Sequence, residues 1–188
     1  MRKTSIKRPH FSVGLFISTV AVILGFIPAY AGLPGKEIPR RHLTWGMELG
    51  SSIDMSGYDL STIDFDLTAG YRSRAIQTLG IGTGIHRAIG SKNTFIPIYF
   101  LCRTSFVSRP TLCFMHFKAG YNFNTINDSP TFGGINASIG LGFNLSSSRH
   151  FTSHVVVAYG FRHFNSREKN PLETDNINLA QLSFGLNF

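Results

Sequence analysis

Beyond residue 41, apolar and polar residues alternate with a period of two along most of the chain. In one clear case, Ile63 and Phe65 alternate with Asp64 and Asp66. Alternation of this kind is typical of a β-strand with one apolar and one polar face. It predicts eight strands at about residues 42–53, 61–72, 77–88, 94–107, 111–123, 132–146, 150–163 and 176–188. We therefore expect an all-β chain with a single β-domain at 42–188.

The polar faces of the predicted strands differ from the surface of an ordinary soluble protein. They are rich in glycine and small polar residues, which suit the narrow interior of a barrel. They also carry charges of both signs, whereas a soluble surface would carry many more lysines and glutamates. The charges that we expect to pair inside a barrel are Glu48, Asp64, Asp66, Arg103, Lys118 and Arg162. His86, His116 and His154 stand on the same faces and are expected to fill the lumen.

Aromatic residues on the apolar faces gather near the ends of the predicted strands. They are Trp45, Tyr71, Tyr121, Phe123, Phe151 and Phe188. Membrane barrels carry such aromatic girdles at the two lipid interfaces. Strands of about 9–11 residues suffice to cross a bilayer, and a closed barrel leaves no unpaired strand edge in lipid. The pattern predicts an eight-stranded antiparallel up-and-down transmembrane β-barrel whose apolar face contacts lipid.

The predicted connections differ in length between the two ends of this barrel. Short connections, as on the periplasmic side of bacterial barrels, are expected at 73–76, 108–110 and 147–149. Longer outer connections are expected at 54–60, 89–93, 124–131 and 164–175. A soluble periplasmic β-sandwich or a lipocalin-like binder would show the same alternation with its apolar face turned inward. The direction of the apolar face therefore decides between these classes.

The N-terminus has the organisation of a cleavable secretory signal peptide. The first ten residues are basic, residues 11–27 are apolar, and Ala29 and Ala31 place small residues where a signal peptidase reads them. We expect a signal peptide at 1–31 and a lead-in segment at 32–41. The alternative is an uncleaved membrane anchor. Export of a barrel by this route predicts a location in the outer membrane of a Gram-negative bacterium.

Composition excludes some classes of function. Charged residues make up only 15% of the 188-residue chain, against about 25% in a typical soluble domain. The formal net charge is +8, but Arg2, Lys3, Lys7 and Arg8 of the predicted signal peptide supply four of these charges. The other basic residues are scattered, so we expect no nucleic-acid partner. The cysteine and histidine spacings match no metal site, and we expect no cofactor.

The C-terminal segment Ala180–Phe188 ends on phenylalanine and has apolar residues at alternate positions before it. It resembles the C-terminal signal of outer-membrane proteins, which the barrel assembly machinery reads. Segments Phe117–Tyr121 and Gly133–Gly142 resemble the outer-membrane β-barrel domain family of Bacteroidota. The resemblance implies contact with outer-membrane lipid and with the assembly machinery through the strand that ends at Phe188. It implies neither an oligomeric state nor an activity, so we expect a non-enzymatic barrel with a structural or surface-interaction role.

A weaker resemblance indicates an alternative function, an outer-membrane lipid A or phospholipid esterase. Lipid A deacylases of the PagL type are eight-stranded barrels with a His and a Ser two residues apart near the C-terminus and a Glu further on. His163 would then be the general base, Ser166 the nucleophile, and Glu173 or Glu168 the carboxylate that orients the imidazole. The family spacing would put the nucleophile at Asn165, so no catalytic residue is assigned beyond this alternative.

Two further questions stay open at the level of the sequence. Cys102 and Cys113 lie on the same predicted face near one hairpin, and export permits either a disulfide or two separate thiols. The polar lumen allows either a conducting, porin-like pore or an interior plugged by its own side chains, which is usual for eight strands.

Overall fold

The computed structural model describes residues 43–58, 60–72, 76–89, 93–105, 112–126, 129–147, 151–164 and 176–188. Its strands are β1 Leu43–Asp54, β2 Thr62–Tyr71, β3 Ile76–Ala88, β4 Thr94–Ser105, β5 Cys113–Ile126, β6 Ser129–Ser147, β7 Thr152–His163 and β8 Asn176–Asn187. The predicted all-β class is confirmed, and most predicted strand limits lie within two residues of the observed ones. Nowhere in the described residues is there a helix with the length and apolar character needed to cross a membrane.

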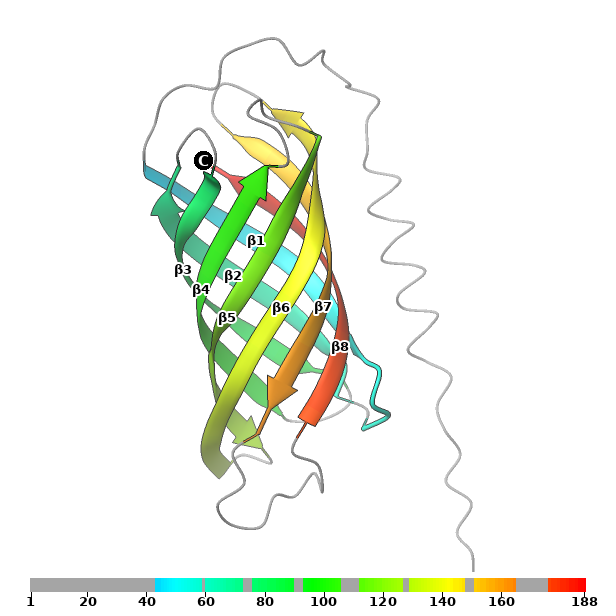
Figure 1. Ribbon diagram of the computed structural model, residues 1–188. Coiled ribbons are helices and arrows are strands. Elements are labelled where there is room, and N and C mark those ends of the chain that lie inside the picture. The colour runs from blue at the N-terminus through cyan, green and yellow to red at the C-terminus, as the bar shows by residue number, and fades with distance from the viewer. Residues whose placement is uncertain are drawn as a thin grey trace, which may run out of the picture.

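The strands form one closed sheet. Each strand pairs antiparallel with the next one along the chain, and β1 also pairs with β8 (Figure 1). The closing register runs from Gly46 opposite Asn187 to Asp54 opposite Leu179. The predicted eight-stranded antiparallel up-and-down barrel is therefore confirmed. Closure gives every strand a hydrogen-bonding neighbour on both sides, which is what a sheet surrounded by lipid requires.

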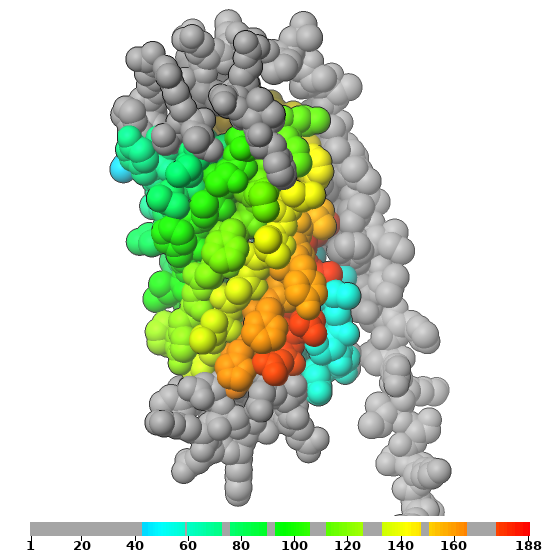
Figure 2. All heavy atoms as spheres, viewed as in Figure 1, coloured from blue at the N-terminus to red at the C-terminus, as the bar shows by residue number. Residues whose placement is uncertain are grey.

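The apolar faces of the strands point outward and form the wall of the barrel, one side of which Figure 2 shows. Exposed apolar side chains occur on successive strands and include Trp45, Phe65, Ile81, Ile98, Phe117, Ile139 and Val157. The residues between them point inward, and among these Glu48 and Arg103 have 2% and 0% of their surface exposed. The soluble sandwich alternative is wrong, because it requires the apolar face at the centre and the charges outside.

Aromatic residues form clusters at both rims of this wall. At one rim, the rings of Trp45 and Phe188 stack with centroids 4.3 Å apart, and Phe151 lies 6.4 Å from Phe188. At the other, Tyr121 and Phe123 make an edge-on contact at 5.4 Å. The predicted positions of these aromatics near strand ends are confirmed. The partly polar rings of Trp45 and Tyr121 suit the boundary between hydrocarbon and water, and the phenylalanine rings pack beside them.

The prediction of a connection at 124–131 is wrong. Strand β5 runs to Ile126 and β6 begins at Ser129, so both extend into this segment, and Asn124 pairs with Thr131 and Thr125 with Pro130. The segment is polar and rich in turn-forming residues, which favoured a loop interpretation. Backbone pairing does not require an apolar face, so a hairpin can extend beyond the lipid, where water solvates both of its sides. The predicted strand 94–107 also has an earlier limit, at Ser105, and residues 106–107 lie outside the described residues.

Candidate functional site

The inside of the barrel holds the most concentrated chemistry in the described residues. Glu48 of β1 forms ion pairs with Arg103 of β4 and with Lys118 of β5, the latter at 2.9 Å. Lys118 also donates to Asp66 of β2 at 2.8 Å. Its ammonium group lies 4.7 Å from the centre of the Tyr99 ring, which adds a cation–π contact. A single lysine thus joins two carboxylates across the lumen.

A second group of contacts is centred on His86 of β3. Its Nε2 lies 3.1 Å from Asp66, and its Nδ1 lies 3.5 Å from Asp64 and 3.3 Å from the guanidinium of Arg162. Asp64 also accepts hydrogen bonds from the hydroxyls of Ser52 and Thr62. Because Asp66 contacts both His86 and Lys118, the two groups form one network that extends from β1 to β7.

The network is balanced in charge. The three carboxylates of Glu48, Asp64 and Asp66 face the three cationic groups of Arg103, Lys118 and Arg162. A buried charge is costly unless it is paired and hydrogen-bonded. The prediction that these six side chains point into the lumen is confirmed. Glu48 and Asp66 pair directly with Arg103 and Lys118, whereas Asp64 and Arg162 meet through His86. Alternation along each strand places them inside, and closure of the sheet brings them together.

The two other predicted luminal histidines also lie inside the barrel. Arg103 donates its Nε–H to Nδ1 of His116 at 3.2 Å, so this nitrogen acts as an acceptor. His154 is fully buried, with Nε2 3.5 Å from Glu48 and its ring 5.8 Å from that of Phe114. The expectation that His86, His116 and His154 fill the lumen is confirmed.

Buried apolar side chains cluster inside the barrel toward both ends, which the sequence did not lead us to expect. We call the end that carries the β1–β2, β3–β4, β5–β6 and β7–β8 connections the outer end, following the predicted orientation. A buried cluster fills the lumen there and is called the outer cap: Leu60, Ala88, Phe95, Phe164, Ile177 and Leu179. A second cluster of Phe114, Val156 and Ala158 lies toward the other end. The available signal was apolar residues at inward positions, such as Phe95 and Leu179, between polar neighbours.

No protein-family model and no curated protein matches the sequence. Among solved structures, the chain is similar to the N-terminal β-barrel domain of OprF from Pseudomonas aeruginosa, with a TM-score of 0.53 and 12% sequence identity. The match covers 77% of this chain and 97% of that one. The chain has the fold of a small bacterial outer-membrane β-barrel.

Two other solved barrels are less similar. Neisserial surface protein A has a TM-score of 0.47 and 12% identity, over 77% of this chain and 94% of that one. The outer membrane enzyme PagL has a TM-score of 0.45 and 12% identity, over 74% of this chain and 97% of that one.

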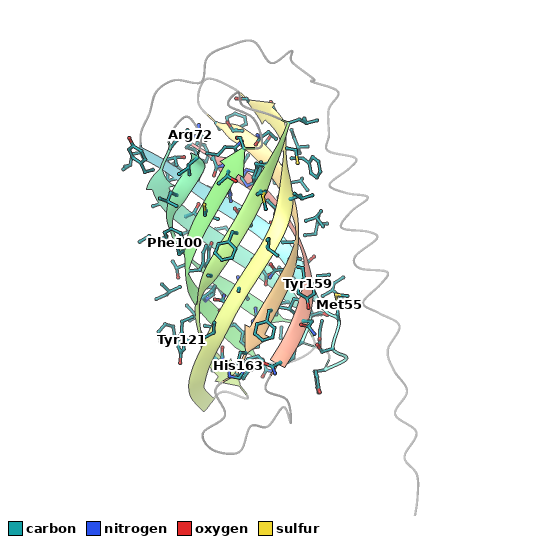
Figure 3. The ribbon with its side chains drawn as sticks, in the orientation of Figure 1. Met55, Arg72, Phe100, Tyr121, Tyr159 and His163 are labelled. Carbon is teal, nitrogen blue, oxygen red and sulfur yellow. The ribbon has the colours of Figure 1, made fainter. Side chains whose placement is uncertain are left out.

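Of the residues in the alternative esterase site, the structure describes only His163, the expected general base. His163 ends β7 at the outer end of the barrel, opposite to the end at which Arg72 follows β2 (Figure 3). Its Nδ1 lies 2.8 Å from the side-chain oxygen of Asn176, the first residue of β8. Ser166, Glu168 and Glu173 lie outside the described residues. The esterase site therefore stays a prediction.

The two cysteines do not form a disulfide with each other. Both stand on outward positions, as predicted, but the register places Cys102 opposite Phe117 rather than opposite Cys113. Four residues of extended strand separate Phe117 from Cys113, about 13 Å at the usual rise. A disulfide needs Cα atoms within about 7 Å, so the register leaves two separate thiols.

Proposed function

We propose that the protein is a non-enzymatic integral outer-membrane barrel with a structural or surface-interaction role. The observation that carries this proposal is the combination of an apolar outer wall with an interior filled by paired charges. An apolar outer wall is stable in the hydrocarbon of a membrane, and an interior filled by side chains is typical of a rigid scaffold rather than of an open pore.

The filled lumen supports the structural part of the role. The ion pairs around Glu48 and Lys118 occupy its middle, and the outer cap occupies the space above them. A large solute cannot pass without displacing both layers. This arrangement favours the plugged interior over the porin-like alternative that the sequence left open.

The β1–β2 connection supports the surface-interaction part. The carboxylate of Asp54 accepts hydrogen bonds from the backbone N–H groups of Ser56 and Tyr58, both at 2.7 Å, and of Leu60 at 3.3 Å. These bonds hold the connection in one conformation while Tyr58 remains 43% exposed and Met55 64% exposed. Ordered apolar and aromatic side chains above the wall are the kind that protein partners use at interfaces.

The proposal includes the route to the membrane. A signal peptide at 1–31, a lead-in at 32–41 and a barrel domain at 42–188 give an exported chain. Strand β8 with the terminal Phe188 is the signal for the barrel assembly machinery, and outer-membrane lipid is the partner of the apolar wall. The residues before Leu43 lie outside the described part of the chain.

Fractionation tests the location. Expressed with its own N-terminus in a Gram-negative host, the protein is expected in the outer-membrane fraction, migrating differently on a gel when heated and unheated. Recovery as a soluble periplasmic protein would overturn the proposal.

The assembly signal is tested by deleting Phe188. The deletion removes the terminal residue, its stacking contact with Trp45 and its two backbone hydrogen bonds with Trp45. The matched control is Trp45→Ala, which removes the same stack and keeps the terminus and these backbone hydrogen bonds. We expect the deletion to reduce the assembled fraction well below that of Trp45→Ala. Equal reductions would mean that only the aromatic contact matters.

The non-enzymatic part is tested by mass spectrometry of lipid A and phospholipids from cells with and without the protein. Unchanged acyl chains are expected. Loss of an acyl chain that is abolished in His163→Ala and Ser166→Ala variants would instead establish the esterase.

A further inference from the structure

A polar patch interrupts the apolar wall at the outer end of three neighbouring strands. It consists of Arg87, Thr94 and Thr125, which the register places side by side on β3, β4 and β5. Arg87 alternates with the buried residues His86 and Ala88, so its side chain points outward, where it is exposed. It is the one exposed charged side chain in the described strands. We call these three residues of β3, β4 and β5 the rim patch.

The rim patch lies at the outer limit of the apolar belt. From Leu79 to Arg87, β3 extends about 26 Å at the usual rise per residue, and a strand tilt of about 35–45° reduces this to a height of about 20 Å. Leu79 pairs with Tyr71, the aromatic residue that ends β2 at the opposite rim. The apolar band of a membrane barrel is about 25 Å tall. A long arginine side chain spans the remaining height, so we expect its guanidinium among the lipid headgroups.

The chemistry of the rim patch is that of an anion-binding site. A terminal nitrogen of Arg87 donates to Thr94 Oγ1 at 2.7 Å, which fixes the guanidinium beside the threonine. A guanidinium has five N–H donors, and this bond uses one of them. The Thr94 hydroxyl accepts in the same bond, so its O–H can donate to a second acceptor. Phosphate oxygens match such a group of donors, because a guanidinium binds phosphate in a bidentate geometry.

Exposed apolar side chains adjoin the rim patch. Ile63 stands opposite Arg87 in the register, and Ile85, Ile96 and Phe123 each lie two positions along a strand from a residue of the patch. Between 43% and 55% of the surface of each of these four side chains is exposed. Donors above an exposed apolar surface match both parts of a lipid, a phosphate headgroup and its acyl chains. A free anion matches only the donors.

We propose that the rim patch binds the phosphate headgroup of an outer-leaflet lipid whose acyl chains lie on Ile85, Ile96 and Phe123. The phosphate accepts hydrogen bonds from the Arg87 guanidinium and the Thr94 hydroxyl, and its negative charge is opposite to that of the guanidinium. The inference rests on the proposed membrane role and adds a specific lipid contact to it. Because the rim patch carries the one exposed cation of the described strands, the lipid is held on one side of the barrel.

Nuclear magnetic resonance tests the contact on the full chain, expressed with its own N-terminus and purified in a neutral detergent. Phosphatidic acid added to the micelles should shift the Nε–H signal of Arg87, and diacylglycerol with the same acyl chains should leave it unchanged. Inorganic phosphate at the same concentration should have little effect, because it has no acyl chains. The absence of a shift with phosphatidic acid, or an equal shift with either of the other two compounds, would overturn the proposal.

A pair of arginine variants separates this site from general attraction between charges. Arg87→Gln removes the cation of the rim patch, whereas Arg72→Gln removes a cation at the opposite end of the barrel (Figure 3). In native mass spectrometry, Arg87→Gln should reduce the preference for phosphatidic acid over diacylglycerol by about fivefold, the size expected for an exposed charge pair. Arg72→Gln should retain this preference. An unchanged preference in Arg87→Gln, or an equal loss in both variants, would contradict the assignment.

Failure of this site is distinguishable from failure of the membrane role. Heat-modifiable migration checks that each variant folds, and the titration of the unchanged protein decides where a variant does not. A barrel that is found in the outer-membrane fraction but does not respond to phosphatidic acid would lose only the lipid site. A chain recovered from the soluble periplasm would lose the membrane role as well.

Discussion

At the scale of the residue, the luminal charges are each held by more than one partner. Glu48 contacts Arg103, Lys118 and His154, and Asp66 contacts both Lys118 and His86. Several partners for each charge reduce the cost of removing it from water. Loss of Glu48 would leave Arg103 without a carboxylate partner and Lys118 with Asp66 alone.

The change Glu48→Leu tests this dependence. It leaves Arg103 and Lys118 in the lumen without their shared carboxylate, and removal of one partner of a buried ion pair costs about 3–5 kcal/mol. We expect urea unfolding in lipid vesicles, followed by the fluorescence of Trp45, to show a loss of that size. The double change Glu48→Leu with Arg103→Met should recover part of it. A double variant less stable than the single one would contradict the assignment.

Luminal glycines accommodate the large inward rings. Tyr99 lies opposite Gly82 on β3 and Gly120 on β5, and a Cβ atom at Gly82 would overlap the Tyr99 ring. Gly160 differs, because the atoms nearest to a Cβ there belong to the end of the flexible Gln181 side chain, at 3.0 Å or more. The glycines on the polar faces are therefore not equivalent.

The two glycines give a matched pair of variants. Gly82→Ala should destabilise the barrel by about 1–3 kcal/mol, the usual cost of inserting a methyl group into a packed interior. Gly160→Ala should cost less, because Gln181 can move aside. Unfolding midpoints measured side by side check the difference. Equal losses would mean that backbone conformation, rather than the Tyr99 ring, decides the effect.

At the scale of the element, backbone hydrogen bonding sets the limits of the strands more than the alternation of apolar and polar side chains does. The β5–β6 hairpin continues past the apolar belt, and the β1–β2 connection is ordered by one carboxylate. Asp54 ends β1 and accepts from the backbone of the next turn, in which Gly57 adopts a φ of 85°. This conformation is readily available to glycine and costly for most other residues.

The change Asp54→Ala should loosen this connection without opening the barrel. Each hydrogen bond to a charged group contributes about 1.5–3 kcal/mol, so amide exchange at Ser56 and Tyr58 should accelerate by about tenfold or more. Amides in the middle of β1 should keep their protection. Asp54→Asn retains an acceptor oxygen and serves as the control. Faster exchange along the whole of β1 would instead mean that Asp54 supports the closing seam.

At the scale of the whole molecule, the apolar wall and the charged interior are two sides of one closed sheet. We expect the wall to contact the hydrocarbon of the membrane, so the free-energy cost of a charged side chain on it depends on the depth of that side chain in the bilayer. Ile139 lies in the middle of β6 and is 52% exposed, whereas Leu43 begins β1 at the rim and is 80% exposed.

A lysine placed at these two positions tests the membrane orientation. Ile139→Lys should lower the free energy of unfolding from vesicles by about 2–4 kcal/mol, and Leu43→Lys by about 0–1 kcal/mol. The measurement is equilibrium unfolding in vesicles. In detergent micelles, which deform around a charge, the difference should shrink. Equal effects in vesicles would contradict a lipid-facing wall.

The sequence by itself determined the strands, their two faces and the presence of charges of both signs on the inner face. Alternation is local, and each residue of a strand reports its own side of the sheet, so the outward Ile63 and the inward Asp64 could be assigned without a partner strand. The same reasoning placed His86, His116 and His154 in the lumen.

Only the tertiary structure decided which residues meet across the barrel. Register sets Cys102 opposite Phe117, continues the β5–β6 hairpin through Asn124, and assembles the outer cap from separate strands. It also sets Asn136 of β6 opposite Arg162 of β7. These contacts join residues far apart in the chain, and a shift of one strand by two residues would keep every face while changing every partner.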